Sequence, residues 1–130
     1  DLVYPQKVAT LQLAAGSQRF LVISAVGADK NSSIFYSRTK GQLEEALTTL
    51  GYPCLCIFRP SFIMGDRTEK RVGEKIGIFI AKLINPILIG PLKKYKPVSA
   101  LALAKSMQYE AHHFLNGTHI ISSDKIKSFE

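Results

Sequence analysis

A tyrosine and a lysine one helical turn apart are the residues of this sequence whose types and spacing could do chemistry. Tyr36 and Lys40 are the first and last residues of the segment YSRTK. On an α-helix, residues four positions apart lie on the same face. A lysine ammonium near a phenol favours the phenolate and so lowers the pKa of the tyrosine. This spacing predicts that Tyr36 acts as a general acid or base.

A serine 12 residues before this tyrosine adds a hydrogen-bonding group to the pair. Ser24 lies in a continuously apolar segment, residues 20–26, which is typical of a strand buried on both faces of a parallel sheet. Open sheets of this kind bind ligands beyond the carboxyl ends of their strands. We expect the Ser24 hydroxyl to bind a substrate carbonyl or hydroxyl oxygen. The Tyr–Lys spacing alone is weak evidence, because an aromatic ring resting on the sheet beside an exposed lysine would also produce it.

The elements that must position these residues alternate between helices and short apolar strands. The patterns predict helices over residues 3–15, 35–50, 72–83 and 100–114, strands over residues 20–26, 54–58 and 118–121, and a last helical turn from residue 123. Ser99 is placed to cap the fourth helix, and Glu44 and Glu45 are expected to face solvent. Alternation of this kind indicates an α/β fold with a parallel sheet of about three strands and flanking helices. We expect residues 1–130 to form one domain.

These residues together resemble a known family of oxidoreductases. The matching features are Ser24 with the residues after it, AVGADK, the YSRTK segment with Gly41 and two glutamates, and the run Phe58-Arg59-Pro60. They resemble the atypical short-chain dehydrogenase/reductase family. The likeness is greatest to the subgroup of Tat-interacting oxidoreductase-like proteins and bacterial nucleoside-diphosphate-sugar epimerase-like proteins. The resemblance implies the C-terminal half of a Rossmann-like, doubly wound parallel sheet.

The resemblance also implies a role for each candidate site residue. Ser24 would polarise the substrate oxygen, Tyr36 would exchange a proton with it, and Lys40 would hold the nicotinamide ribose and tune the tyrosine. The segment after the second strand would contact the cofactor through Pro60, Ser61, Phe62 and Ile63. The implied activity is NAD(P)-dependent hydride transfer between a nicotinamide and a carbonyl or alcohol of a small-molecule substrate.

One feature of the resembled family is missing from this sequence. Members hold the cofactor pyrophosphate with a Gly-x-x-Gly-x-x-Gly turn after their first strand. None of the nine glycines here forms that pattern. We therefore expect a fragment, with the N-terminal glycine-loop half absent, that does not bind the cofactor alone. A sheet cut in this way would expose the edge of the strand over residues 20–26, and we expect self-association through that edge.

Composition limits the remaining function classes. The formal net charge of +7 favours NADP over NAD, but aromatic residues do not alternate with the basic ones, so we do not expect a nucleic-acid partner. The residue spacing indicates no metal site, and no apolar run is long enough to predict a membrane span. The sequence shows no secretory leader, and Cys54 and Cys56 are predicted to be buried free thiols. From these features we expect a cytoplasmic protein.

A second function remains open beside the oxidoreductase. A Rossmann scaffold can bind a nucleotide, or a protein partner, without carrying out chemistry. The alternative is therefore a non-catalytic nucleotide-sensing or protein-interaction protein. The presence of Ser24, Tyr36 and Lys40 together favours the enzyme.

Overall fold

The computed structural model describes residues 2–64, 97–113 and 115–130. The described elements are α1 (Val3–Ala14), β1 (Arg19–Ile23), α2 (Phe35–Thr49), β2 (Cys54–Arg59), β3 (Ile63–Met64), β4 (Val98–Ser99), α4 (Ala100–His112), β5 (Gly117–Ser122) and α5 (Ser123–Lys127). The helix predicted over residues 72–83 lies outside the described residues.

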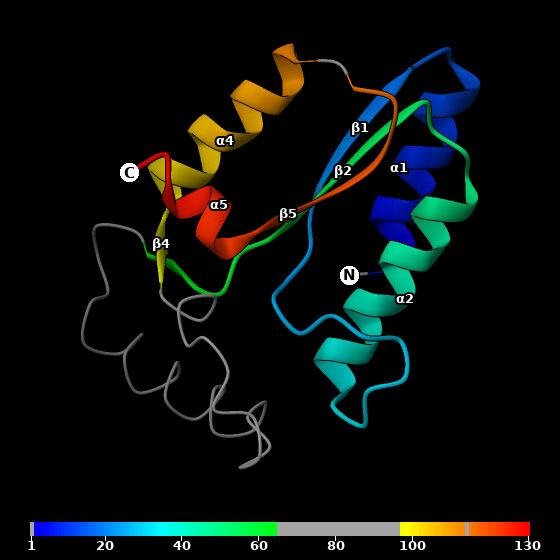
Figure 1. The fold of residues 1–130 in the computed structure, drawn as a ribbon. Helices are drawn as coiled ribbons and strands as arrows, with labels where there is room; N and C mark the ends of the chain where they lie inside the picture. Colours follow the sequence, from blue (N-terminus) through cyan, green and yellow to red (C-terminus); the bar gives the residue numbers. More distant parts are fainter. Residues whose placement is uncertain (1, 65–96, 114) are drawn as a thin grey trace.

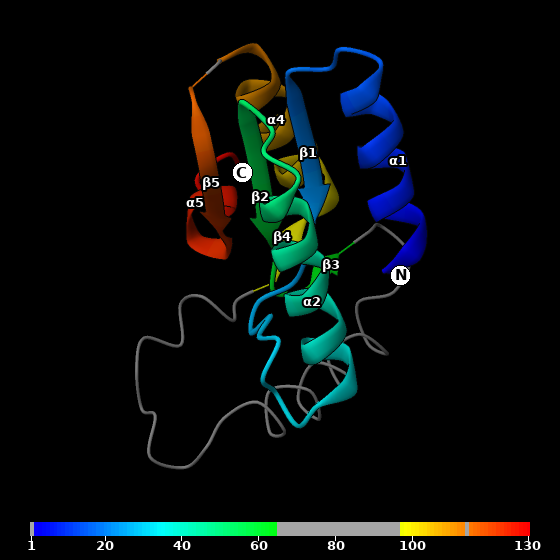
Figure 2. The ribbon, with the colours of Figure 1, turned by 90° about the vertical axis from the view of Figure 1, so that its right-hand side faces the viewer.

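Three parallel strands form the main sheet, in the order β1-β2-β5. Helices α1 and α2 lie on one face of this sheet, and α4 and α5 lie on the other (Figures 1 and 2). The result is a layer of strands between two layers of helices. This arrangement confirms the predicted α/β class and is consistent with half of a Rossmann-like fold.

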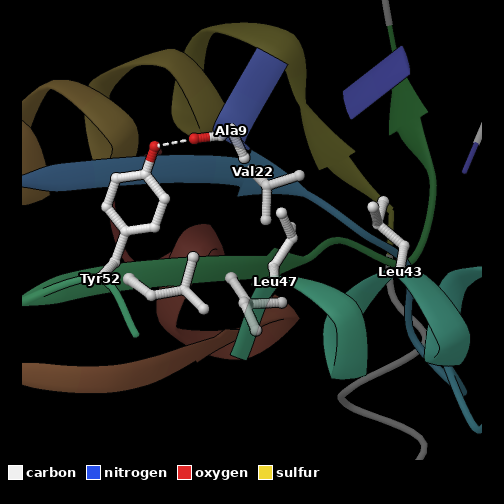
Figure 3. Close-up of a cluster of buried hydrophobic side chains, with 7 residues drawn as sticks. Ala9, Val22, Leu43, Leu47 and Tyr52 are labelled. Atoms are coloured by element: carbon white, nitrogen blue, oxygen red, sulfur yellow. Dashed lines mark hydrogen bonds between the residues drawn. The ribbon is translucent and has the colours of Figure 1, made fainter. Parts of the chain in front are cut away.

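The central strand β2 supplies side chains to two separate cores. Successive residues of a strand point to opposite faces, so Leu55 and Ile57 face the helix pair α1 and α2. That core also contains Ala9, Val22, Leu43, Leu47 and Tyr52 (Figure 3). The Tyr52 hydroxyl donates a hydrogen bond to the Ala9 carbonyl oxygen, 2.5 Å away, and so ties the end of α2 to α1. On the opposite face, Cys54, Cys56 and Phe58 pack with Val98, Leu103, Ile121 and Ile126.

The first strand is less buried than its sequence predicts. A continuously apolar run predicts burial on both faces, but Arg19 to Leu21 are only half-buried and Ile23 is 37% exposed. The reason is the position of β1 at one edge of the sheet, because a central strand is covered from both sides by its neighbours. Among the strands that the structure describes, β2 lies between the other two and shows the predicted pattern, with Cys54 to Phe58 all buried.

A second, two-stranded sheet joins parts of the chain that are far apart in the sequence. Ile63 in β3 pairs with Val98 in β4, and the Val98 amide donates a 2.8 Å hydrogen bond to the Phe62 carbonyl oxygen. Directly after β4, the Ser99 hydroxyl accepts a 3.0 Å hydrogen bond from the Ala102 amide, which confirms the predicted cap of α4. The segment that follows β2 is therefore anchored to the start of α4.

Candidate active site

The parallel sheet brings the residues after β1 and β2 to the same edge. The Ser24 amide donates a 2.7 Å hydrogen bond to the Phe58 carbonyl oxygen, and the Val26 amide donates one of 3.1 Å to the Pro60 carbonyl oxygen. Strand pairing thus continues beyond the last residue of β1. As a result Ser24 lies beside the chain that enters the Pro60–Ile63 segment.

A glycine allows the loop after Ser24 to pack directly on α2. A Cβ atom added to Gly41 would lie 2.1 Å from the Lys30 amide nitrogen and 2.3 Å from the Asp29 carbonyl carbon, so only glycine fits here. The Asp29 amide donates a 3.0 Å hydrogen bond to the Ser37 carbonyl oxygen of the same helix. This close approach fixes the loop against the first two turns of α2, which carry Tyr36 and Lys40.

One cavity of about 570 Å³ collects the predicted site residues. Its lining includes all seven of them: Ser24, Tyr36, Lys40, Pro60, Ser61, Phe62 and Ile63. The volume lies within the usual range for a ligand pocket. The sequence therefore predicted which residues share a site, while their chemical roles stay predictions.

The Tyr36–Lys40 pair differs in one respect from what its spacing alone predicts. The Lys40 Nζ lies 5.8 Å from the centre of the Tyr36 ring, so the two side chains share one face of α2 as predicted. Partial burial raises the pKa of Tyr36 above 10.0 instead of lowering it. The expectation of a lysine-lowered tyrosine pKa is therefore wrong for the protein without cofactor. The phenol form, a proton donor, is favoured.

Ser24 presents a buried hydroxyl to the cavity. The residue is 3% exposed, and its Oγ has no hydrogen-bond partner among the described residues. A buried hydroxyl without a partner costs free energy, so such groups are usually satisfied by a ligand or an ordered water. This is the position in which a substrate oxygen would complete the hydrogen bonding of Ser24.

The wall opposite α2 is held by hydrogen bonds from α5. The buried Ser123 Oγ accepts a 3.2 Å hydrogen bond from the Ser61 amide and lies 3.1 Å from the Ser61 Oγ, to which it donates. Ser123 is 2% exposed. These contacts and the β3–β4 pairing fix the backbone of Pro60 to Ile63 along the cavity.

A part-buried ion pair between α2 and the end of β2 was not expected from the sequence. Glu44 was predicted to face solvent, but it is 7% exposed and forms a two-point contact with Arg59. The Arg59 Nε donates to Glu44 Oε1 at 3.0 Å, and Nη2 donates to Oε2 at 2.5 Å. The Glu44 carboxylate raises the pKa of Arg59 further. One feature of the sequence could have indicated the burial of Glu44. It follows Lys40 by one helical turn and therefore lies on the same face of the helix.

Sequence reasoning also missed three apolar residues that line the cavity. These are Ile23, Ala25 and Ile34, which flank Ser24 and precede Tyr36. Their positions next to predicted site residues could have indicated them.

Among the described residues, no group of three or more metal-ligating side chains is arranged to hold a metal ion. Within the same part of the chain, no helix has the length and hydropathy needed to cross a membrane.

Comparison with known proteins finds relatives over most of the chain. The protein named fmp52, mitochondrial, from Aspergillus niger is 37% identical over 112 residues, which are 86% of this chain and 47% of the relative. The protein named fmp52-1, mitochondrial, from Aspergillus terreus is 34% identical over 112 residues, or 86% and 48% of the two chains. Protein HTATIP2 from Rattus norvegicus is 40% identical over 74 residues, or 57% and 31%. No family model matches the chain.

These similarities agree with the resemblance to the atypical short-chain dehydrogenase/reductase family that the sequence motifs indicated. The parallel sheet and the cavity at its strand ends agree with that resemblance as well. The chain spans less than half the length of each of these three relatives.

The prediction of a cytoplasmic protein is contradicted by the comparison. Several relatives, among them those from Aspergillus niger and Aspergillus terreus, are named as mitochondrial proteins. The prediction depended on two free cysteines and on the lack of a secretory leader and a membrane span. None of these features distinguishes the cytoplasm from the interior of a mitochondrion.

Proposed function

We propose that the protein is an NAD(P)-dependent oxidoreductase that interconverts a carbonyl compound and an alcohol. The observation that carries this proposal is that Ser24, Tyr36 and Lys40 line the same cavity. The Ser24 hydroxyl in it is buried and has no hydrogen-bond partner among the described residues. A hydrogen-bond donor, a proton donor and a cation around one pocket are the groups that this reaction needs. Similarity to Protein HTATIP2 and the Phe58-Arg59-Pro60 run favour the Tat-interacting oxidoreductase-like subgroup.

The residues present fit a nicotinamide cofactor in part. Lys40 offers a cation to the ribose hydroxyls, and the fixed backbone from Pro60 to Ile63, including Ser61 and Phe62, offers a wall for the ring. When bound, the nicotinamide supplies a hydride to the carbonyl carbon in reduction or accepts one in oxidation. The net charge of +7 favours NADP. Because the sequence contains no glycine-rich turn, we propose that pyrophosphate binding needs residues other than those of this chain.

Each of the three polar side chains Ser24, Tyr36 and Lys40 has a separate role in the proposed reaction. The Ser24 hydroxyl donates a hydrogen bond to the substrate oxygen and holds it within reach of α2. The Tyr36 hydroxyl gives its proton to that oxygen as the carbonyl is reduced, and takes the proton back in the reverse direction. The raised pKa of Tyr36 keeps the phenol protonated at neutral pH, which suits carbonyl reduction. The Lys40 ammonium stabilises the phenolate that forms after transfer.

The proposal is tested by a substrate screen with NADPH and NADH on this chain together with the residues that bind the pyrophosphate. Loss of absorbance at the wavelength of the reduced nicotinamide reports carbonyl reduction, and cofactor affinity is measured separately by calorimetry. Turnover with at least one aldehyde or ketone supports the oxidoreductase. Nucleotide binding without turnover of any carbonyl compound contradicts it.

The second candidate is the non-catalytic nucleotide-sensing or protein-interaction protein. It would use the same cavity to bind a ligand without carrying out chemistry. In the screen above, this candidate predicts binding of nucleotide without turnover.

The names of the relatives further lead us to propose a mitochondrial location, which fractionation of cells expressing the tagged protein would test.

A further inference from the structure

We infer that the cavity takes an uncharged, apolar carbonyl compound or alcohol, such as an aryl-alkyl ketone, rather than a keto acid or a phosphorylated sugar. The inference rests on the proposed function and adds the class of substrate to it. Two observations support it. The cavity wall is largely apolar, and basic residues outside the wall already have partners.

The described wall of the cavity is largely apolar. Six of its ten residues carry no polar side-chain atom: Ile23, Ala25, Ile34, Pro60, Phe62 and Ile63. The polar groups are two serines, one tyrosine and one lysine, which the proposed chemistry already uses. Transfer of a carboxylate or phosphate into such surroundings is costly unless a cation pairs with it. Of the described lining residues, only Lys40 is charged, and it is assigned to the cofactor and the tyrosine.

Two described arginines, in α2 and at the end of β2, have other partners and do not line the cavity. Arg59 is committed to Glu44 in the buried two-point ion pair. Arg38 donates hydrogen bonds to the carbonyl oxygens of Ser32 and Ser33, at 3.1 and 3.4 Å, and does not line the cavity.

Lys30, in the loop between β1 and α2, also has a partner. Its Nζ forms an exposed ion pair with Glu45 Oε1 at 2.5 Å. Among the residues that the structure describes here, an anionic substrate would have to compete for Lys40 or break one of these contacts to obtain a counter-charge. An uncharged substrate needs none of them.

Two lining residues leave apolar surface in contact with water in the absence of a ligand. Ile23 is 37% exposed and Ile63 is 44% exposed, although both form part of the cavity wall. A ligand with a phenyl or alkyl group would remove this surface from water, which favours binding. Its carbonyl oxygen would at the same time satisfy the buried Ser24 hydroxyl. One small molecule with an apolar body and a single acceptor oxygen therefore matches both features.

The test compares two ligands that share a skeleton and differ by one carboxylate. These are 4-phenylbutan-2-one and 2-oxo-4-phenylbutanoate, and their dissociation constants are measured by calorimetry with and without NADP. We expect the ketone to bind at least about tenfold more tightly, because the keto acid must desolvate its carboxylate. Equal affinity, tighter binding of the keto acid, or binding of neither ligand would overturn the inference. This comparison uses the unmodified protein and does not depend on any variant.

A matched pair of variants ties the preference to the cavity. Ile63→Lys places an ammonium at the wall, and we expect it to weaken ketone binding and strengthen keto acid binding. Leu101→Lys introduces the same cation at an exposed residue of α4 outside the cavity and should change neither constant. Circular dichroism of both variants checks that they fold. The same response in both variants would contradict the assignment of the ligand to this cavity.

A parallel assay of NADPH oxidation with the same two ligands, on this chain together with the residues that bind the pyrophosphate, separates this inference from the proposed function. Ketone binding without NADPH oxidation supports the ligand class and contradicts the oxidoreductase. Oxidation with the keto acid but not with the ketone supports the oxidoreductase and overturns the ligand class.

Discussion

Glu44 and Arg59 join helix α2 to the end of strand β2 through two hydrogen bonds, with Nε–Oε1 and Nη2–Oε2 distances of 3.0 and 2.5 Å. Glu44 stands one helical turn beyond Lys40, and Arg59 directly precedes Pro60. The ion pair therefore connects the helix that carries the proposed catalytic residues to the wall that faces them. Since Glu44 is 7% exposed, water cannot replace a missing partner.

Glu44→Gln is expected to lower the free energy of unfolding by about 1–3 kcal/mol, because it leaves the half-buried Arg59 guanidinium without its carboxylate. The matched control is Glu45→Gln, which removes the exposed ion pair to Lys30 and should cost less than about 1 kcal/mol. Urea denaturation measures both. Equal effects at the two neighbouring positions would show that burial of the Glu44 pair is not important.

Gly41→Ala is expected to destabilise the protein, although the same change in an exposed helix stabilises by about 1 kcal/mol. The added methyl would overlap the backbone of Asp29 and Lys30 in the loop that follows Ser24. Thermal unfolding gives the sign of the effect. Amide exchange at Asp29 gives the position, because its hydrogen bond to Ser37 must lengthen if the loop moves. A more stable variant with an unchanged Asp29 exchange rate would contradict the packing.

The stability of the protein is expected to fall as the pH rises above about 9. Burial, with the Cys54 thiol beside it, raises the pKa of Cys56 from 9.0 to about 12. Between these values the unfolded chain loses the thiol proton while the native state keeps it. The native state then binds more protons, so the free energy of unfolding decreases with pH.

Urea unfolding of the protein and of Cys56→Ala between pH 8 and 10 measures this slope. We expect the variant to lose most of it. Tyr36 and Tyr52, whose pKa values burial also raises, contribute only above about pH 10. The same decrease in both proteins would mean that Cys56 does not carry the effect.

We expect the protein to self-associate through the edge of β1. Within the described part of the chain, β1 pairs with β2 on one side and with no strand on the other. An edge strand with free backbone groups and apolar side chains pairs readily with a second copy. Sedimentation velocity at micromolar concentration is the measurement, with a dimer or larger species as the expected result. A monodisperse monomer would contradict it.

The sequence was sufficient to predict the elements around the site because their signals are local. Helix α2 and strand β2 have regular patterns of apolar residues, and the residues after parallel strands must share one edge of the sheet. Ser24 and Pro60 could therefore be placed together without knowledge of the tertiary structure. The Tyr36–Lys40 pair followed from helical geometry alone.

The features that were missed depend on contacts between distant residues. Burial of Glu44 depends on Arg59, 15 residues away, and the pairing of Ile63 with Val98 spans 35 positions. The direction of the Tyr36 pKa shift also depends on tertiary structure, since burial of the phenol raises this pKa. No periodic pattern in the sequence encodes these relationships.

Replacement of Tyr36 by Phe tests the central claim most directly. The measurement is made on this chain together with the residues that bind the pyrophosphate. It gives the turnover of a carbonyl substrate with NADPH and the dissociation constants of both ligands. Loss of the proton donor is expected to lower kcat by a factor of about 100 or more, while both dissociation constants change by less than about threefold. Unchanged turnover in Tyr36→Phe would show that the cavity of Ser24, Tyr36 and Lys40 does not carry out the proposed proton transfer.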